Sequence, residues 1–97
     1  MVLVDHELKI FSSYIQWILN YDENYKKERY LLLGGGREVY KLNIKDNSQY
    51  TSIKGIHENT YCAMMIGDLL VVGGYYHIYF IDIPEFVTIE KLKYQEG

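Results

Sequence analysis

The chain has 97 residues, of which 48% are hydrophobic and 15% aromatic, and its formal net charge is −3 (10 Lys and Arg against 13 Asp and Glu). This length fits one small domain, and the apolar content argues against a disordered chain. Neither sign of charge is gathered into a stripe that could neutralise a phosphate backbone, so we expect no nucleic-acid partner.

Three features of the chain predict a cytoplasmic protein without a membrane partner. The amino-terminal "MVLVDHELKIF" carries acidic residues where a signal peptide needs basic ones, and "IFSSYIQWILNY" is too short and too polar to span a bilayer. Cys62 is the only cysteine and lies in the apolar run "TYCAMMI". It cannot form an internal disulfide, so we expect a buried structural thiol in a reducing compartment and no metal site.

The first half of the chain reads as four strands, predicted over residues 14–20, 30–34, 39–44 and 49–54. The polar insert "YDENYKKER" is expected to form an exposed loop between the first two. The segment 8–20 is ambiguous by periodicity. Its apolar residues also fit a helical stripe, which comprises Leu8, Phe11, Ile15, Ile18 and Leu19. Ile15, Trp17 and Leu19 alternate as in a strand, and the repeat described next favours the strand.

The second half reads as four more strands, over residues 60–66, 68–73, 77–83 and 87–92, with a tight Gly67-Asp68 turn joining the first two. When Ile78 is placed under Val39, "LLLGGGREVYKLNI" (31–44) aligns without gaps on "LVVGGYYHIYFIDI" (70–83). The glycine pairs and a tyrosine coincide: Gly34 with Gly73, Gly35 with Gly74, and Tyr40 with Tyr79. The offset between the two segments is 39 residues (78 − 39), and a repeat of about 40 residues that is built from strands indicates propeller blades. We therefore divide the single region 1–97 into a first blade, 1–54, and a second, 55–97.

The glycine run Gly34–Gly36 is interpreted as a turn signal. A phosphate-binding loop requires a helix directly after it, whereas "REVYKLNI" follows as an alternating strand pattern. The lysine and hydroxyl residues of a P-loop are also missing. The glycines are expected to let the strand end and turn where side chains would crowd.

The segment "YTSIKGIHENTYCAMMIGDLLVVGGYYHIYFIDI" (50–83) resembles the WD-repeat β-propeller family. Gly55 and His57 stand at the Gly-His position with Ile56 inserted, "LLVVGG" matches strand b, and "IYFIDI" matches strand c, where Asp82 keeps the acid. The sequence departs from the family pattern in three places. In the second unit Ile81 stands at the tryptophan position of strand c, and in the first unit Leu42 and Asn43 stand at the tryptophan and aspartate positions. Tyr75, Tyr76 and His77 occupy the b–c turn, which usually carries an Asp. The buried hydrogen-bond network of the family therefore cannot be complete.

The resemblance implies an all-β fold of two four-stranded antiparallel propeller-type blades. A blade needs a neighbour on each face, so two blades leave two apolar faces in water. Three solutions are open. The chain is part of a longer propeller, it assembles as three or four copies, or its strands form one small barrel or sandwich.

Catalysis finds little support, because His6, His57 and His77 show no metalloprotease spacing and the serines lack a nucleophile elbow. We expect no enzyme and no cofactor. By resemblance, the d–a and b–c loops share a rim on which a protein or peptide partner docks. The rim residues are Arg37, Glu38, His57, Glu58, Asn59, Tyr75, Tyr76 and His77.

Tyrosine and arginine are enriched at the energetic centres of interfaces, which suits this rim. The alternative is that Tyr75 and Tyr76 only pack against their neighbours. His57 is a remnant of the family network, an exposed loop residue or part of the binding face. We expect a non-catalytic protein–protein interaction scaffold that self-associates or joins further blades. The alternative function is a self-contained β domain that binds a polar ligand such as a sugar through its tyrosines.

Overall fold

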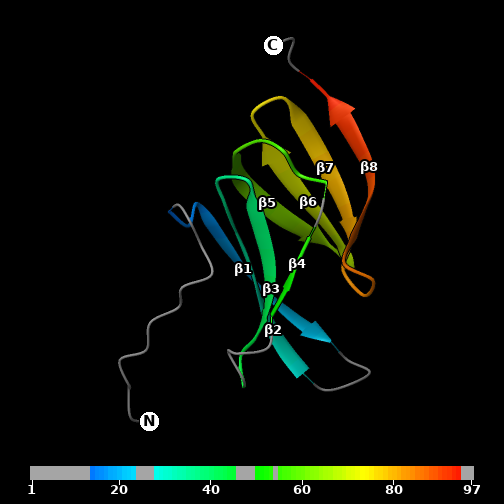
Figure 1. Cartoon of the computed structure of the whole chain (residues 1–97). Helices are drawn as coiled ribbons and strands as arrows, with labels where there is room; N and C mark the ends of the chain where they lie inside the picture. The colour runs from blue at the N-terminus through cyan, green and yellow to red at the C-terminus, as the bar shows by residue number, and fades with distance from the viewer. Residues whose placement is uncertain (1–13, 24–27, 46–49, 54, 95–97) are drawn as a thin grey trace.

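The computed structural model describes residues 14–23, 28–45, 50–53 and 55–94, and within them it contains strands and no helix. The first sheet has the order β1-β2-β3-β4, and the second has the order β5-β6-β7-β8. All neighbouring strands are antiparallel (Figure 1). The first sheet comprises β1 (Trp17–Glu23), β2 (Glu28–Gly35), β3 (Glu38–Asn43) and β4 (Tyr50–Ser52). The second comprises β5 (Thr60–Ile66), β6 (Leu69–Gly74), β7 (His77–Asp82) and β8 (Val87–Lys93).

These elements confirm the predicted all-β class with two four-stranded antiparallel sheets. The division between residues 54 and 55 falls in the connection between the sheets. The strand interpretation of the ambiguous amino-terminal segment is confirmed for Trp17 onward, while residues 8–13 lie outside the described residues. Since each sheet keeps its own four strands, the described residues do not form a single closed barrel.

The polar insert departs from the prediction, because both of its ends belong to strands. Tyr21 pairs with Tyr30 and Asp22 with Arg29, so β1 and β2 form a longer hairpin than expected. Tyr21 is only 8% exposed and packs in the core. The pairing also places Asp22 Oδ1 3.8 Å from Arg29 Nε, which sets opposite charges side by side on the strands.

The register confirms that the two sheets are structural repeats. Gly34 lies opposite Val39 in the first sheet, and Gly73 lies opposite Ile78 in the second, so positions that the sequence alignment treats as equivalent pair in the same way. In the first strand of each sheet, the residues opposite these glycines are Trp17 and Cys62. Side chains at repeat-equivalent positions therefore lie on equivalent faces.

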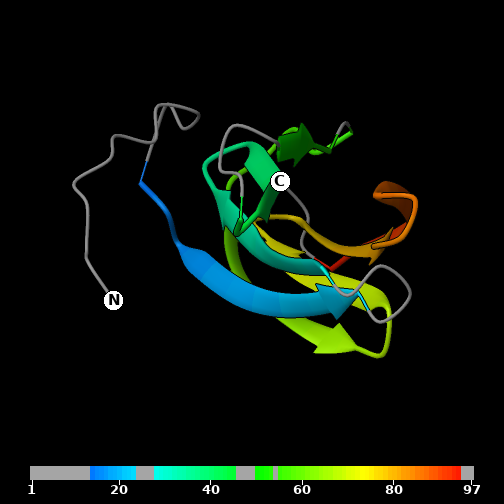
Figure 2. The same cartoon turned by 90° about the horizontal axis from the view of Figure 1, so that it is seen from below.

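The core lies between the two sheets, which are stacked as layers (Figure 2). Leu32 and Val39 come from the first sheet and are 0% exposed. The second sheet contributes Leu70, Val72 and Ile81, which are also 0% exposed. Burial of these apolar side chains is the main force that holds the sheets together.

Two of the expectations for glycine and cysteine are wrong in detail. Gly34 and Gly35 lie inside β2, and the left-handed turn residue is Gly36, with φ 56°. A side chain at Gly34 would collide with Trp17, because its Cβ would lie 2.0 Å from the Trp17 ring. Cys62 is exposed and not buried. Alternation along β5 turns Ala63 toward the first sheet and leaves Cys62 on the opposite side.

Candidate functional site

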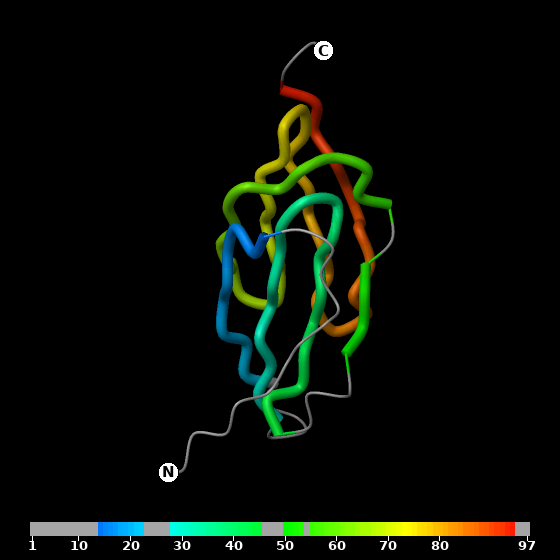
Figure 3. Tube along the Cα trace, turned by 60° about the vertical axis from the view of Figure 1, so that its left-hand side comes forward, coloured from blue at the N-terminus to red at the C-terminus, as the bar shows by residue number. Residues whose placement is uncertain are grey.

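The predicted rim is built where the connection from β4 to β5 passes between the β2–β3 turn of the first sheet and the β6–β7 turn of the second (Figure 3). The Thr60 amide donates to the Gly36 carbonyl (3.0 Å), which joins this connection to the β2–β3 turn. The Tyr75 amide donates to the Asn59 carbonyl (3.0 Å), which joins it to the β6–β7 turn. Backbone hydrogen bonds therefore bring together loops from both sheets.

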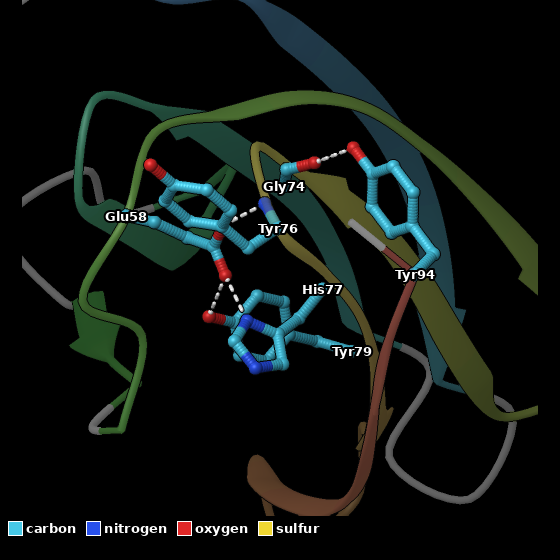
Figure 4. Close-up of polar contacts among 6 residues, drawn as sticks. All are labelled: Glu58, Gly74, Tyr76, His77, Tyr79 and Tyr94. Carbon is cyan, nitrogen blue, oxygen red and sulfur yellow. Dashed lines mark hydrogen bonds and ion pairs between the residues drawn. The ribbon is translucent and has the colours of Figure 1, made fainter. Parts of the chain in front are cut away.

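Glu58 is the centre of the rim, although its side chain is buried. Its carboxylate accepts a hydrogen bond from the Tyr76 amide and another from the Tyr79 hydroxyl (2.6 Å), and its Oε1 lies 2.6 Å from His77 Nδ1 (Figure 4). These contacts occupy both oxygens with groups of the same chain. The carboxylate ties the β4–β5 connection to the β6–β7 turn and is not presented to a partner.

The environment of Glu58 favours its ionised form. Burial by itself raises the pKa of this carboxyl, but the hydrogen bonds from Tyr79, Tyr76 and His77 together lower it by more, so the net pKa lies below the ordinary value of 4.5. The pKa of Tyr79 shifts in the opposite direction, because burial and the adjacent Glu58 carboxylate both raise the pKa of its hydroxyl. Tyr79 therefore remains a neutral donor to Glu58.

The other rim residues divide by exposure. Arg37, His57, Asn59 and Tyr75 are exposed, and Glu38, Tyr76 and His77 are half-buried. The rings of Tyr75 and Tyr76 meet edge to face with centroids 4.6 Å apart, so they pack on each other. His57 is an exposed loop residue, and the Glu58 carboxylate bonds with His77 and Tyr79 instead.

A second candidate surface, which the sequence prediction did not assign to residues, is the outer face of the second sheet, on the side away from the first. Strand pairing places Cys62 opposite Gly73, Met64 opposite Val71 and Ile66 opposite Leu69 on this face. Met64 is 55% exposed and Ile66 is 56% exposed. The outer face comprises the apolar or small residues Cys62, Met64, Ile66, Leu69, Val71, Gly73, Ile78, Phe80 and Leu92, and two acidic residues, Asp82 opposite Leu69 and Glu90 opposite Phe80, lie on the same face toward its β8 side.

The far side of the first sheet also carries apolar side chains, some buried and some exposed. Leu33 and Leu42 lie on that side, yet they are only 2% and 6% exposed. Ile18 and Tyr50 on the same side are about half exposed (57% and 48%). On the outer face of the second sheet, by contrast, every apolar side chain is exposed or half-buried.

A hollow of about 420 Å³ opens on this outer face above Gly73. Its lining contains no charged side chain. The lining residues are Tyr61, Cys62, Ala63, Met64, Val71, Gly73, Gly74, Ile78 and Tyr94. Tyr94 is held at the edge of the hollow by its hydroxyl, which donates to the Gly74 carbonyl (Figure 4). One signal in the sequence pointed here: strands β5 to β7 are apolar at both alternating sets of positions.

Among the described residues, no group of three or more His, Cys, Asp or Glu side chains could hold a metal ion. A helix with the length and apolarity to cross a membrane is likewise not found in the described ranges. No protein-family model, curated protein or solved structure matches the chain.

Proposed function

We propose that this chain is a non-catalytic protein–protein interaction scaffold built from two WD-type propeller blades. Its partner covers the outer face of the second sheet, and the exposed rim residues add polar contacts at one end. The proposal includes a cytoplasmic location, which the lone cysteine supports. The observation that carries it is the exposed and largely apolar outer face, since contiguous exposed apolar patches mark interaction sites.

The repeat strengthens this proposal, because the equivalent face of the first sheet is covered by the second sheet. In the first sheet, Trp17, Leu32 and Val39 occupy the positions of Cys62, Val71 and Ile78. The first three side chains are buried against the second sheet. The same position in the repeat is therefore a contact surface in the first sheet, where a neighbour exists, and an exposed surface in the second.

The sugar-binding alternative receives less support. Sugar sites combine an aromatic platform with several polar groups that bind hydroxyls. Tyr75 and Tyr76 pack edge to face, and the hollow beside Tyr61 and Tyr94 is lined by thiol, thioether and aliphatic side chains. An apolar protein surface is the better complement to this lining.

Light scattering of the purified chain tests the proposal. In the absence of a partner, the outer face can be covered only by another copy of the chain. We expect association that grows with concentration. Met64→Lys places a charge on the outer face and should weaken association at least tenfold, or about 1.4 kcal/mol. Ile44→Lys is the matched control, since Ile44 is 47% exposed outside the strands and its replacement should change nothing.

Two results would contradict the proposal. One is a monomer at every concentration up to about 1 mM, with identical behaviour of the Met64→Lys variant. The other is equal weakening by Ile44→Lys, which would show that any added charge suppresses nonspecific aggregation.

A further inference from the structure

The hollow above Gly73 occupies the position that a tryptophan side chain fills in the first sheet. Trp17 lies opposite Gly34, and a Cβ on Gly34 would come within 2.0 to 2.3 Å of three atoms of its indole ring. The ring therefore lies directly over the glycine. Cys62 lies opposite Gly73, the repeat equivalent of Gly34, and its Sγ would be 2.8 Å from a Cβ there. Both sheets thus have a glycine at this position, but the side chain opposite it is an indole in the first sheet and a much smaller thiol in the second.

The dimensions and chemistry of the hollow suit an uncharged aromatic ring. Its volume of about 420 Å³ falls within the range of roughly 300 to 1,000 Å³ that ligand pockets occupy. The uncharged lining disfavours a charged group, whose burial would be costly without a paired charge. Cys62 and Met64 place sulfur in the lining, and methionine sulfur packs favourably against aromatic rings.

We propose that this hollow binds a tryptophan side chain of a partner protein, with the indole over Gly73 as Trp17 lies over Gly34. The inference rests on the proposed function, in which a partner covers the outer face. A second copy cannot supply the indole, because Trp17 is the only tryptophan and is 7% exposed in the core. Tryptophan is also among the residues enriched at the energetic centres of interfaces.

The packing of the two sheets shows how the N–H group of such an indole finds a hydrogen-bond acceptor. Trp17 Nε1 donates to Thr60 Oγ1 across the two sheets (3.0 Å), so the ring is both stacked on glycine and hydrogen-bonded to the neighbouring sheet. In the hollow, the Tyr94 hydroxyl donates to the Gly74 carbonyl, and its oxygen retains lone pairs that can accept an N–H group. The outer face therefore offers a glycine floor, an apolar wall and an acceptor.

The test is a titration of the isotopically labelled chain with N-acetyl-tryptophanamide, followed by NMR below the concentration at which the chain associates. We expect saturable shifts of the Cys62, Gly73 and Ile78 amides. N-acetyl-leucinamide should bind at least fivefold more weakly, and N-acetyl-lysinamide should produce no saturable shift. Absence of saturable shifts at these amides would overturn the proposal, and so would equal binding of the leucine compound.

Filling the hollow provides the matched control. Cys62 is exposed and is the only cysteine, so the folded protein can be modified there with a benzyl thiosulfonate, which places a ring over Gly73, or with a methyl thiosulfonate, which does not. The benzyl adduct should lose tryptophanamide binding at least tenfold, while the methyl adduct stays within about twofold of the unmodified chain. Cys62→Trp should also abolish binding and, by analogy with Trp17, raise the melting temperature. Undiminished binding by the benzyl adduct would place the ligand elsewhere and refute the assignment.

The two proposals fail in different ways. If Met64→Lys prevents association but tryptophanamide does not bind, the outer face is a docking surface and only the indole assignment falls. If the chain neither associates nor binds the probe, the proposed function falls with it.

Discussion

Among single residues, Glu58 illustrates how a side chain predicted to meet a partner is used inside the chain. Its carboxylate is 9% exposed in the fold and accepts hydrogen bonds from the Tyr76 amide and the Tyr79 hydroxyl. An ionised carboxylate bonded in this way is a charge-assisted acceptor, stronger than a neutral one. Its loss would release the β4–β5 connection from the β6–β7 turn.

The lowered pKa of Glu58 predicts a specific dependence of stability on pH. A carboxyl whose folded pKa lies below its unfolded value stabilises the fold above the unfolded pKa, near 4.5, and this contribution is lost as pH falls through the folded pKa. Glu58→Gln should therefore lower the free energy of unfolding at about pH 7 by roughly 1 to 3 kcal/mol. The difference from the wild-type chain should shrink below about pH 4.

Urea unfolding followed at several pH values measures this difference. Glu90→Gln is the control, since Glu90 is exposed on β8 and its replacement should leave the pH profile unchanged. A Glu58→Gln difference that stays constant down to about pH 2 would show that the ionised carboxylate is not what stabilises the loop.

Between strands, the Trp17–Gly34 pair decides how closely β1 and β2 can approach the second sheet. The indole lies over the glycine and is 7% exposed, so it fills the space between the sheets. Gly34→Ala should destabilise the chain by about 3 kcal/mol, because the new Cβ would lie 2.0 Å from a ring that has no room to move. Gly73→Ala should cost less than about 1 kcal/mol, since its neighbour Cys62 Sγ is exposed and can rotate away.

Thermal or urea unfolding of these two variants is a direct comparison of repeat-equivalent positions. In a Trp17→Ala background, the cost of Gly34→Ala should fall by more than half, because the colliding ring is gone. Equal destabilisation by Gly34→Ala and Gly73→Ala would mean that backbone conformation, and not the indole, requires glycine at both positions.

In the molecule as a whole, each sheet buries the apolar inner face of the other. Hydrogen bonds cross between them from Trp17 Nε1 to Thr60 Oγ1, from the Tyr21 hydroxyl to Asp68 Oδ1 and from the Thr60 amide to the Gly36 carbonyl, each 3.0 Å. The apolar contacts between the sheets carry most of the stability, since a fully buried aliphatic side chain contributes about 1.5 to 3 kcal/mol.

A fragment comprising residues 55–97 should therefore not fold alone. Its inner face would expose Leu70, Val72 and Ile81, all 0% exposed in the complete chain, and their loss of burial removes roughly 5 to 9 kcal/mol, which is comparable to the whole stability of a small domain. Circular dichroism of fragment 55–97 should show a disordered chain, and mixing with fragment 1–54 should restore the β-sheet signal. A stable β spectrum of the isolated fragment would show that the second sheet is an independent domain.

The sequence was informative wherever a feature repeats along the chain. Alternating apolar residues and the alignment of Val39 with Ile78 predicted the second set of strands closely, and the register of Gly73 with Ile78 follows from that of Gly34 with Val39. The first strand runs over Trp17–Glu23 and not over 14–20 as predicted. The polar insert has no repeat counterpart, and its pairing of Asp22 with Arg29 depends on a cross-strand contact.

The candidate sites were less accessible to this reasoning. Glu58 could be placed in the correct loop from the resemblance, but its burial depends on Tyr79 and His77, which are distant in the chain. Cys62 was assigned to the interior because its neighbours are apolar, whereas it lies on the exposed side of β5. The hollow above Gly73 exists because a cysteine replaces a tryptophan at a position that only strand pairing reveals.

The strands, their order within each repeat and the two alternating sets of side chains on each strand all follow from the pattern of residues. Which set is covered does not follow from that pattern, because a period of two separates the faces of a strand without specifying which of them meets a neighbour. The packing of the sheets makes the choice when both faces are apolar. It stacks the second sheet on Trp17, Leu32 and Val39 and leaves Met64 and Val71 on the outer side.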